Sequence, residues 1–229
     1  MSINPNHKSF LSDLNKELIE TYITLKDFPE ELIQELRTYK NDELFYYKIR
    51  SNRTNNQIEK AARFIYLNQT SYNGIFRVNL KGEYNVPYGF RTKDFFQPII
   101  LRKVSARLQN CQLFCCDFAE IQDNISKGDL VYLDPPYTVS HSNNGFIKYN
   151  QKLFSLEDQN ILSGFIDVLK AKGAYYILSN AFHPKILEIF HKNDTILELK
   201  RASLIGGKNA SRGKITELLF TNVNNHSND

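Results

Sequence analysis

Apolar residues recur at helical spacing in the first seventy residues of the chain. Leu18, Tyr22 and Leu25 follow one another at intervals of four and three, which places them on one face of a helix. Residues 27–30 have the pattern of a capping box with proline in the first turn, and they predict that a second helix begins there. Apolar positions between 58 and 65 predict a third helix by the same spacing.

Short apolar runs alternate with helical patterns in the rest of the chain. The pattern predicts helices over 101–108, from 155 to 173 and over 184–192, and strands over 8–12, 112–116, 130–133, 174–178, 195–199 and 215–221. Such alternation is typical of an open α/β sheet with predominantly parallel strands, in which ligands bind beyond the carboxyl ends of the strands. Asp13, Asp117 and Asp134 each come at the end of a predicted strand, so we expect a ligand site there.

The segment between residues 70 and 92 has a different character. Gly74, Gly82, Pro87 and Gly89 interrupt it, and the pair Asn73-Gly74 is a turn signal. Asn, Tyr and Arg are frequent here, and such side chains suit recognition of a partner better than packing in a core. We therefore expect loops and a hairpin with a binding role.

The composition of the 229 residues is that of an ordinary globular protein, with 41% hydrophobic and 24% charged residues. This length allows one domain, or one core with a modest inserted subdomain. No apolar run approaches the roughly 18 residues of a membrane-spanning helix, and the first eight residues lack the apolar stretch of a secretory signal, so we expect a cytoplasmic protein without a membrane partner. Cys111, Cys115 and Cys116 fit neither a disulfide framework nor a zinc site, and we interpret them as reduced thiols, with no metal.

The charge is distributed unevenly along the chain. The formal net charge is only +4, but residues 45–110 contain 12 Lys and Arg and only 3 Asp and Glu. A solvated basic face is the simpler interpretation of the charge alone, and a polyanionic partner for this segment is the alternative.

The sharpest chemical signal is an apolar strand, 130–133, that leads into Asp134-Pro135-Pro136-Tyr137. One interpretation is a rigid turn, because two prolines fix two φ angles. The other is a catalytic pocket for an exocyclic amine on an aromatic base, which is a poor nucleophile because its lone pair is delocalised into the ring. Asp134 and the Pro135 carbonyl can each accept one amine hydrogen, which restores electron density on the nitrogen, and Tyr137 can stack on the base.

At this point the chain resembles the Dam-type DNA adenine-N6 methyltransferases, the D12 class, over nearly its whole length from about 12 to 222. The matching segments, in the order of the family, are SDLN at 12–15, AARFIYLN at 61–68, YNGIFRVN at 72–79, GEYNVPYG at 82–89, CDF at 116–118, DPPY at 134–137, LSN at 178–180 and RGK at 212–214. The resemblance implies a Rossmann-like core that binds S-adenosylmethionine and an inserted helical and hairpin subdomain that recognises double-stranded DNA. It also implies site-specific methylation of adenine N6.

The resemblance implies a role for each strand-end carboxylate. Residues 134–137 would form the catalytic pocket for an adenine flipped out of the duplex, and Asp134 would also contact the cofactor. Asp13 would bind the ribose hydroxyls of S-adenosylmethionine, Asp117 would accept a hydrogen bond from its adenine amine, and Phe118 would pack against its adenine ring.

The resemblance also implies that residues 72–91 recognise DNA. Tyr72 and Asn73 would fill the space left by the flipped base, which offsets part of the few kcal/mol that flipping costs. The other candidates near the recognised bases or the backbone are Ile75, Arg77, Pro87 and Arg91, of which Arg77 could donate two hydrogen bonds to a guanine edge. Further candidates for phosphate contacts are Arg63, Lys81, Lys93, Lys208, Arg212 and Lys214.

The chain departs from the family in one respect, because its first glycine is Gly74, whereas family members begin with a glycine-rich loop that contacts the cofactor. Three accounts stay open: a fragment of a longer enzyme, one half of a split enzyme whose second chain supplies the loop, or a cofactor-free DNA-binding protein. A methyltransferase of RNA or of protein glutamine is a more distant alternative.

The expected organisation has three parts. Residues 1–44 would begin the methyltransferase core, residues 45–110 would form the DNA-recognition insert, and residues 111–229 would complete the catalytic core. The run 85–89 resembles family members that methylate GATC, but residues 90–92 depart from theirs.

Overall fold

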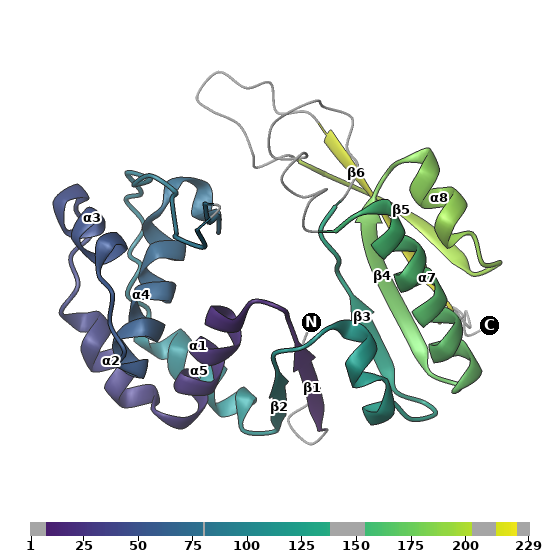
Figure 1. Ribbon diagram of the computed structural model, residues 1–229, viewed down its shortest axis with the longest axis horizontal. Coiled ribbons are helices and arrows are strands. Elements are labelled where there is room, and N and C mark those ends of the chain that lie inside the picture. The colour runs from purple at the N-terminus through teal and green to yellow at the C-terminus, as the bar shows by residue number, and fades with distance from the viewer. Residues whose placement is uncertain (1–7, 80, 138–153, 203–213, 224–229) are drawn as a thin grey trace. The chain divides into compact units, whose positions relative to one another are not determined.

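The computed structural model describes residues 8–79, 81–137, 154–202 and 214–223. It divides into two compact units, Met1–Phe118 (unit 1) and Ala119–Asp229 (unit 2), which are coloured purple to teal and teal to yellow in Figure 1. Both units combine helices with a small sheet, so the expectation of a mixed α/β protein is confirmed. No helix in the described ranges is long and apolar enough to cross a membrane.

Unit 1 is mainly helical. Its helices are α1 (Lys16–Asp27), α2 (Pro29–Arg37), α3 (Glu43–Ser51), α4 (Gln57–Thr70) and α5 (Pro98–Leu108), with a short 3-10 helix at Tyr72–Gly74. The core between them is formed by fully buried side chains such as Leu32, Leu36, Tyr46, Tyr66 and Leu67. The sequence pattern did not predict α3, because only Tyr46 and Ile49 of its nine residues are buried and they give no long apolar stripe.

The start of α2 differs in detail from the prediction. Pro29 occupies the first turn as expected, but the N-cap residue is Phe28 and its side chain makes no capping hydrogen bond. The predicted capping box at 27–30 is therefore wrong. Phe28 instead ends α1, where its amide donates to the Thr24 carbonyl at 2.8 Å, so the two helices share one junction residue.

The sheet of unit 1 has two parallel strands, β1 (Ser9–Ser12) and β2 (Cys111–Phe114). Ser12 is the register partner of Phe114, so both strands end at the same level. The strand predicted over 112–116 is shorter than expected at its carboxyl end, and Asp117 follows β2 after two further residues.

Unit 2 contains a four-stranded sheet in the order β3 (Leu130–Leu133), β4 (Tyr175–Ala181), β6 (Lys214–Thr221), β5 (Thr195–Ala202). Its helices are α7 (Leu156–Ala171) and α8 (Pro184–Phe190), with a 3-10 helix at Phe118–Asn124 at its boundary with unit 1. The capping box predicted at the start of α7 is confirmed, since Ser155 and Asp158 bond each other's backbone amides. β3 and β4 are parallel, but β6 is antiparallel to both of its neighbours.

The expectation of predominantly parallel strands is therefore wrong for unit 2. Residues 203–213 join β5 to β6, and so short a connection favours an antiparallel pair, because a parallel pair needs a crossover of about a dozen residues or more.

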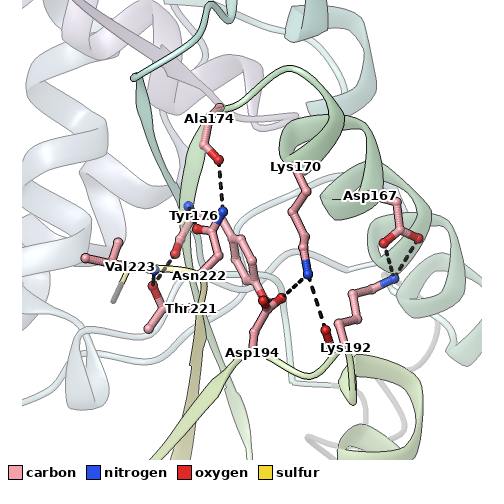
Figure 2. Close-up of polar contacts among 9 residues, drawn as sticks. All are labelled: Asp167, Lys170, Ala174, Tyr176, Lys192, Asp194, Thr221, Asn222 and Val223. Atoms are coloured by element: carbon pink, nitrogen blue, oxygen red, sulfur yellow. Dashed lines mark hydrogen bonds and ion pairs between the residues drawn. The ribbon is translucent and has the colours of Figure 1, made fainter. Parts of the chain in front are cut away.

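A polar network connects α7, β4 and β6 near the start of β4 (Figure 2). The Asp194 carboxylate accepts hydrogen bonds from the Tyr176 hydroxyl at 2.9 Å and from the Lys170 ammonium at 2.6 Å. The Asn222 side chain accepts from the Tyr176 amide at 2.8 Å and donates to the Ala174 carbonyl at 3.0 Å. The register pairs Tyr176 with the second residue of β3, so this network anchors the amino end of the strand pair that carries Asp134 at its other end.

Candidate active site and nucleic-acid interface

The residues 134–137 begin directly at the carboxyl end of β3, as the sequence predicted. Leu133 is buried and lies opposite Leu178 of β4, which leaves Asp134 as the first exposed position after the strand. Tyr137 is half-buried, and its hydroxyl lies 3.1 Å from the Ser179 hydroxyl, with which it shares a hydrogen bond. The structure thus brings together two motifs, 134–137 and 178–180, that lie about forty residues apart in the sequence.

Two buried side-chain amides bond each other next to Ser179. Asn180 and Gln159 are fully buried, and the Asn180 side-chain nitrogen donates to the Gln159 side-chain oxygen at 3.0 Å. The Asn180 oxygen also accepts from the Ala181 amide at 2.9 Å. The sequence analysis missed Gln159, although one signal was available. Gln159 lies on the same face of α7 as the apolar residues Leu162 and Ile166, so a polar side chain there is expected to be buried. These bonds hold the backbone of β4 next to Ser179, whose hydroxyl bonds Tyr137.

Two carboxylates of unit 1 follow its parallel strands. Asp13 comes directly after β1 and is exposed; its carboxylate accepts from the Asn15 amide at 2.7 Å, and its own amide donates to the Phe114 carbonyl at 3.2 Å. Asp117 and Phe118 follow β2 and are half-buried. Because the two strands are parallel and end in register, Asp13 and Asp117 both lie past the carboxyl edge of this sheet. One exposed and one half-buried carboxylate in this position fit a ligand that presents hydroxyl and amine hydrogens.

Residues 72–91, which we call the recognition segment after the role that the resemblance implies, are attached to the helices of unit 1 through alternate side chains. Tyr84, Val86 and Tyr88 are buried. The Val86 carbonyl accepts hydrogen bonds from the Tyr46 hydroxyl at 2.9 Å and from the Arg50 guanidinium at 3.0 Å, both from α3. Burial raises the pKa of Tyr46, which keeps its hydroxyl protonated as a donor. The helix that the sequence pattern missed is thus one of the elements that hold the recognition segment.

The candidate DNA-contacting side chains lie on the other side of this segment. Tyr72 is 45% exposed, and Asn73, Arg77, Pro87 and Arg91 are also exposed. Ile75, the remaining candidate, is half-buried and packs against the core.

The two ends of the segment are joined by backbone hydrogen bonds. The Tyr72 amide donates to the Pro87 carbonyl at 2.9 Å, and the Gly89 amide donates to the Thr70 carbonyl at 2.9 Å. The expected turn is present at Asn73, whose φ of 53° lies in the left-handed region that asparagine tolerates. Residues from both ends of the segment therefore lie side by side.

One phosphate candidate is wrong. Arg63 is 9% exposed, and its guanidinium donates to the carbonyls of Ile49 at 3.2 Å and Arg50 at 3.0 Å at the end of α3, with Glu17 at 3.6 Å. Burial lowers its pKa, and Glu17 opposes that shift. The guanidinium satisfies helix-end carbonyls and does not face solvent. Two other phosphate candidates, Lys208 and Arg212, lie outside the described residues.

Comparison with known proteins gives consistent matches. Residues 2–204 match the family model of D12 class N6 adenine-specific DNA methyltransferases. The chain is 34% identical over 229 residues to the type II methyltransferase M1.LlaDCHI of Lactococcus lactis subsp. cremoris, with 95% of this chain and 80% of that protein covered. It is 32% identical over 231 residues to the type II methyltransferase M.MjaIII of Methanocaldococcus jannaschii, with 94% and 80% covered. It is 30% identical over 221 residues to the DNA adenine methylase of Escherichia coli, with 91% and 77% covered.

The resemblance drawn from ordered short motifs is thereby confirmed, and with it the expectation of an enzyme that methylates adenine in DNA at specific sites. The chain belongs to the D12 class of N6 adenine-specific DNA methyltransferases.

Proposed function

We propose that residues 134–137 form the catalytic pocket in which adenine N6 of double-stranded DNA receives a methyl group. The observation that carries this proposal is the turn at the end of β3, where Asp134 is exposed and Tyr137 is tied to Ser179. Asp134 accepts one hydrogen of the adenine amine and the Pro135 carbonyl accepts the other. Both bonds draw the nitrogen lone pair out of the ring and direct it away from the base plane, and Tyr137 stacks on the flipped base.

S-adenosylmethionine, when bound, supplies an electrophilic methyl group at a sulfonium centre. The Asp13 carboxylate accepts hydrogen bonds from its ribose hydroxyls, Asp117 accepts from its adenine amine, and Phe118 packs on its adenine ring. The amine becomes acidic once it is alkylated, so the proton that leaves nitrogen needs no acceptor of unusual basicity.

The recognition segment supplies the contacts to DNA. Tyr72 and Asn73 occupy the space that the flipped adenine leaves, and Arg77 donates to a guanine edge in the major groove. Ile75 and Pro87 contact neighbouring bases, and Arg91 contacts a phosphate. The likeness of residues 85–89 to GATC-methylating relatives makes GATC the proposed target.

The finer organisation of the chain is also part of the proposal. Residues 1–44 and 111–229 would belong to a Rossmann-like methyltransferase core, and residues 45–110 would be its DNA-recognition insert. The position of the recognition segment on α3 and α4 supports such an insert, as does the excess of basic residues there.

The Asp134→Ala variant tests the catalytic proposal. We expect transfer of labelled methyl groups from S-adenosylmethionine to duplex DNA to be abolished while DNA affinity stays within a few-fold of the wild type. Asp123→Ala, which removes another exposed carboxylate of unit 2, is the matched control and should retain full activity. Loss of DNA binding in Asp134→Ala would instead mean that this carboxylate supports the fold.

Two further measurements test the cofactor and the target. Titration of S-adenosylmethionine into the 229-residue chain should give micromolar binding, about −8 kcal/mol. A folded chain that gives no heat would mean that the glycine-rich loop is required and must come from a longer form of the chain or from a second chain. Restriction enzymes sensitive to adenine methylation should fail to cut methylated GATC sites. GATC sites that stay cleavable while other sites become protected would refute that target.

A further inference from the structure

Arg77 and Asn85 bond each other across the hairpin of the recognition segment. The Arg77 Nε donates to the Asn85 side-chain oxygen at 2.8 Å, and Arg77 Nη2 lies 3.4 Å from the Asn85 backbone oxygen. The Asn85 amide in turn donates to the Arg77 carbonyl at 3.1 Å. One residue therefore holds both the backbone and the guanidinium of Arg77.

These contacts engage only one edge of the guanidinium. A guanidinium carries five N–H donors in one plane, and the bonds to Asn85 use Nε and one hydrogen of Nη2. One hydrogen on Nη1 and the second hydrogen on Nη2 point in the same direction and form the end edge of the group. That edge is the pair of parallel donors that matches the O6 and N7 acceptors of guanine in the major groove.

Asn85 is itself held in place from both sides. Its chain neighbours Tyr84 and Val86 are buried, and the Tyr84 hydroxyl donates to the Ile75 carbonyl at 2.8 Å. The Val86 carbonyl accepts from Tyr46 and Arg50 of α3. The Asn85 side chain thus projects from a backbone fixed to the helices, whereas Arg77 is an exposed, long side chain with many rotamers.

We infer that Asn85 is a positioning residue for DNA specificity: its side-chain oxygen presets the Arg77 guanidinium so that the free edge faces a base. This inference rests on the proposed role of Arg77 in base recognition. It requires no contact between Asn85 and DNA. Without the acceptor, Arg77 can still meet the DNA as a mobile cation, but it loses the fixed orientation on which bidentate recognition depends.

Selection from a library of DNA duplexes, randomised around a central adenine, tests this inference without requiring catalysis. The bound fraction is sequenced for the wild type and for Arg77→Ala, Asn85→Ala, Asn85→Asp and the double variant Arg77→Ala with Asn85→Ala. We expect the wild type to prefer guanine at one position, and Arg77→Ala and Asn85→Ala to reduce that preference at least tenfold at the same position. The double variant should lose no more than Arg77→Ala alone.

Asn85→Asp separates a positioning role from direct contact. Aspartate keeps the oxygen that accepts from Arg77 Nε but cannot donate to a base. We therefore expect Asn85→Asp to retain the guanine preference, even though its negative charge weakens binding to every sequence. The control Lys81→Ala, an exposed cation of the same hairpin, should weaken binding uniformly and leave every base preference unchanged.

Several outcomes would overturn the inference. Asn85→Asp that loses the preference as fully as Asn85→Ala would mean that Asn85 contacts DNA itself. Asn85→Ala that keeps the preference, or that changes a different position from Arg77→Ala, would show that the two residues do not act together. A wild type that selects no base would overturn both this inference and the role of Arg77. Failure of methyl transfer with selection intact would contradict only the proposed catalysis.

Discussion

Gly89 is the position where a single methyl group should disturb the recognition segment most. A Cβ atom at this position would lie 2.4 Å from the Ser71 carbonyl oxygen, 2.5 Å from the Ser71 carbonyl carbon and 2.8 Å from the Tyr72 nitrogen. All three are backbone atoms, so no side chain can rotate away. The chain around Gly89 would have to move by about 1 Å to restore ordinary contact distances of roughly 3.5 Å.

The cost of Gly89→Ala follows from what that movement breaks. It separates the Gly89 amide from the Thr70 carbonyl and the Tyr72 amide from the Pro87 carbonyl, two bonds of 2.9 Å each. Each such bond contributes about 0.5–1.5 kcal/mol net, and overpacking without relaxation costs about 1–3 kcal/mol. Two such bonds come to about 1–3 kcal/mol, the same range as the overpacking, so we expect the free energy of unfolding to fall by about 1–3 kcal/mol.

Urea unfolding followed by tyrosine fluorescence measures this loss, and two other glycines provide controls. Gly164, within α7, has open space around its Cβ position, so Gly164→Ala should be neutral or stabilise by up to about 1 kcal/mol. Gly82 also has open space but a φ of +75°, so Gly82→Ala isolates backbone strain of about 1–2 kcal/mol.

Gly89→Ala should also weaken DNA binding more than Gly164→Ala does. Gly89→Ala moves Pro87 and Tyr72 relative to each other, so we expect at least tenfold weaker binding to duplex DNA, whereas Gly164→Ala should bind as the wild type does. A Gly89→Ala variant as stable as Gly164→Ala would refute the reasoning, because it would mean that the close approach to Ser71 is not required.

Three further predictions concern buried polar groups. Arg63→Met keeps roughly the side-chain volume but removes the hydrogen bonds to the Ile49 and Arg50 carbonyls, so the free energy of urea unfolding should fall by about 2–3 kcal/mol. The control Arg53→Met, at an exposed arginine, should lower it by at most about 1 kcal/mol, and equal losses in the two variants would contradict this prediction. Tyr176→Phe leaves Asp194 with one donor fewer and should cost about 1–2 kcal/mol, measured in the same way; an unchanged midpoint would show that the bond adds nothing. Burial raises the pKa of tyrosines such as Tyr46 and Tyr176 in the folded state, so the unfolded chain releases those protons first. Stability should therefore hold below about pH 10 and fall above it, and an unfolding midpoint that does not move between about pH 9 and pH 11 would contradict the burial.

The sequence predicted correctly several features that depend only on a few adjacent residues. The capping box at Ser155, the apolar strand that ends before Asp134 and the turn at Asn73 were predicted from a few adjacent residues, and each is present. The family and the activity were also accessible, because eight short motifs in a fixed order are far more specific than any one of them.

Features that depend on contacts between distant parts of the chain could not be predicted from the sequence. α3 gives only a weak apolar stripe, and its helical state is stabilised by packing of Tyr46 and Ile49 in the core of unit 1. Arg63 looks like a surface cation in the sequence, and only the neighbouring end of α3 shows that its guanidinium satisfies buried carbonyls. The same holds for Phe28, whose role as a junction between two helices has no local signature.

The sequence by itself determined the family and its activity, because the residue types of the Asp134-Pro135-Pro136-Tyr137 turn and the order of the motifs can be read without the fold. Only the tertiary structure decided which of those residues are in contact. Hydrogen bonds of about 3 Å join Tyr137 to Ser179 and Arg77 to Asn85, and such partners are selected by strand register and by the packing of helices, not by proximity along the chain. The direction of β6 also became clear only from the sheet, in which it pairs antiparallel with both β4 and β5.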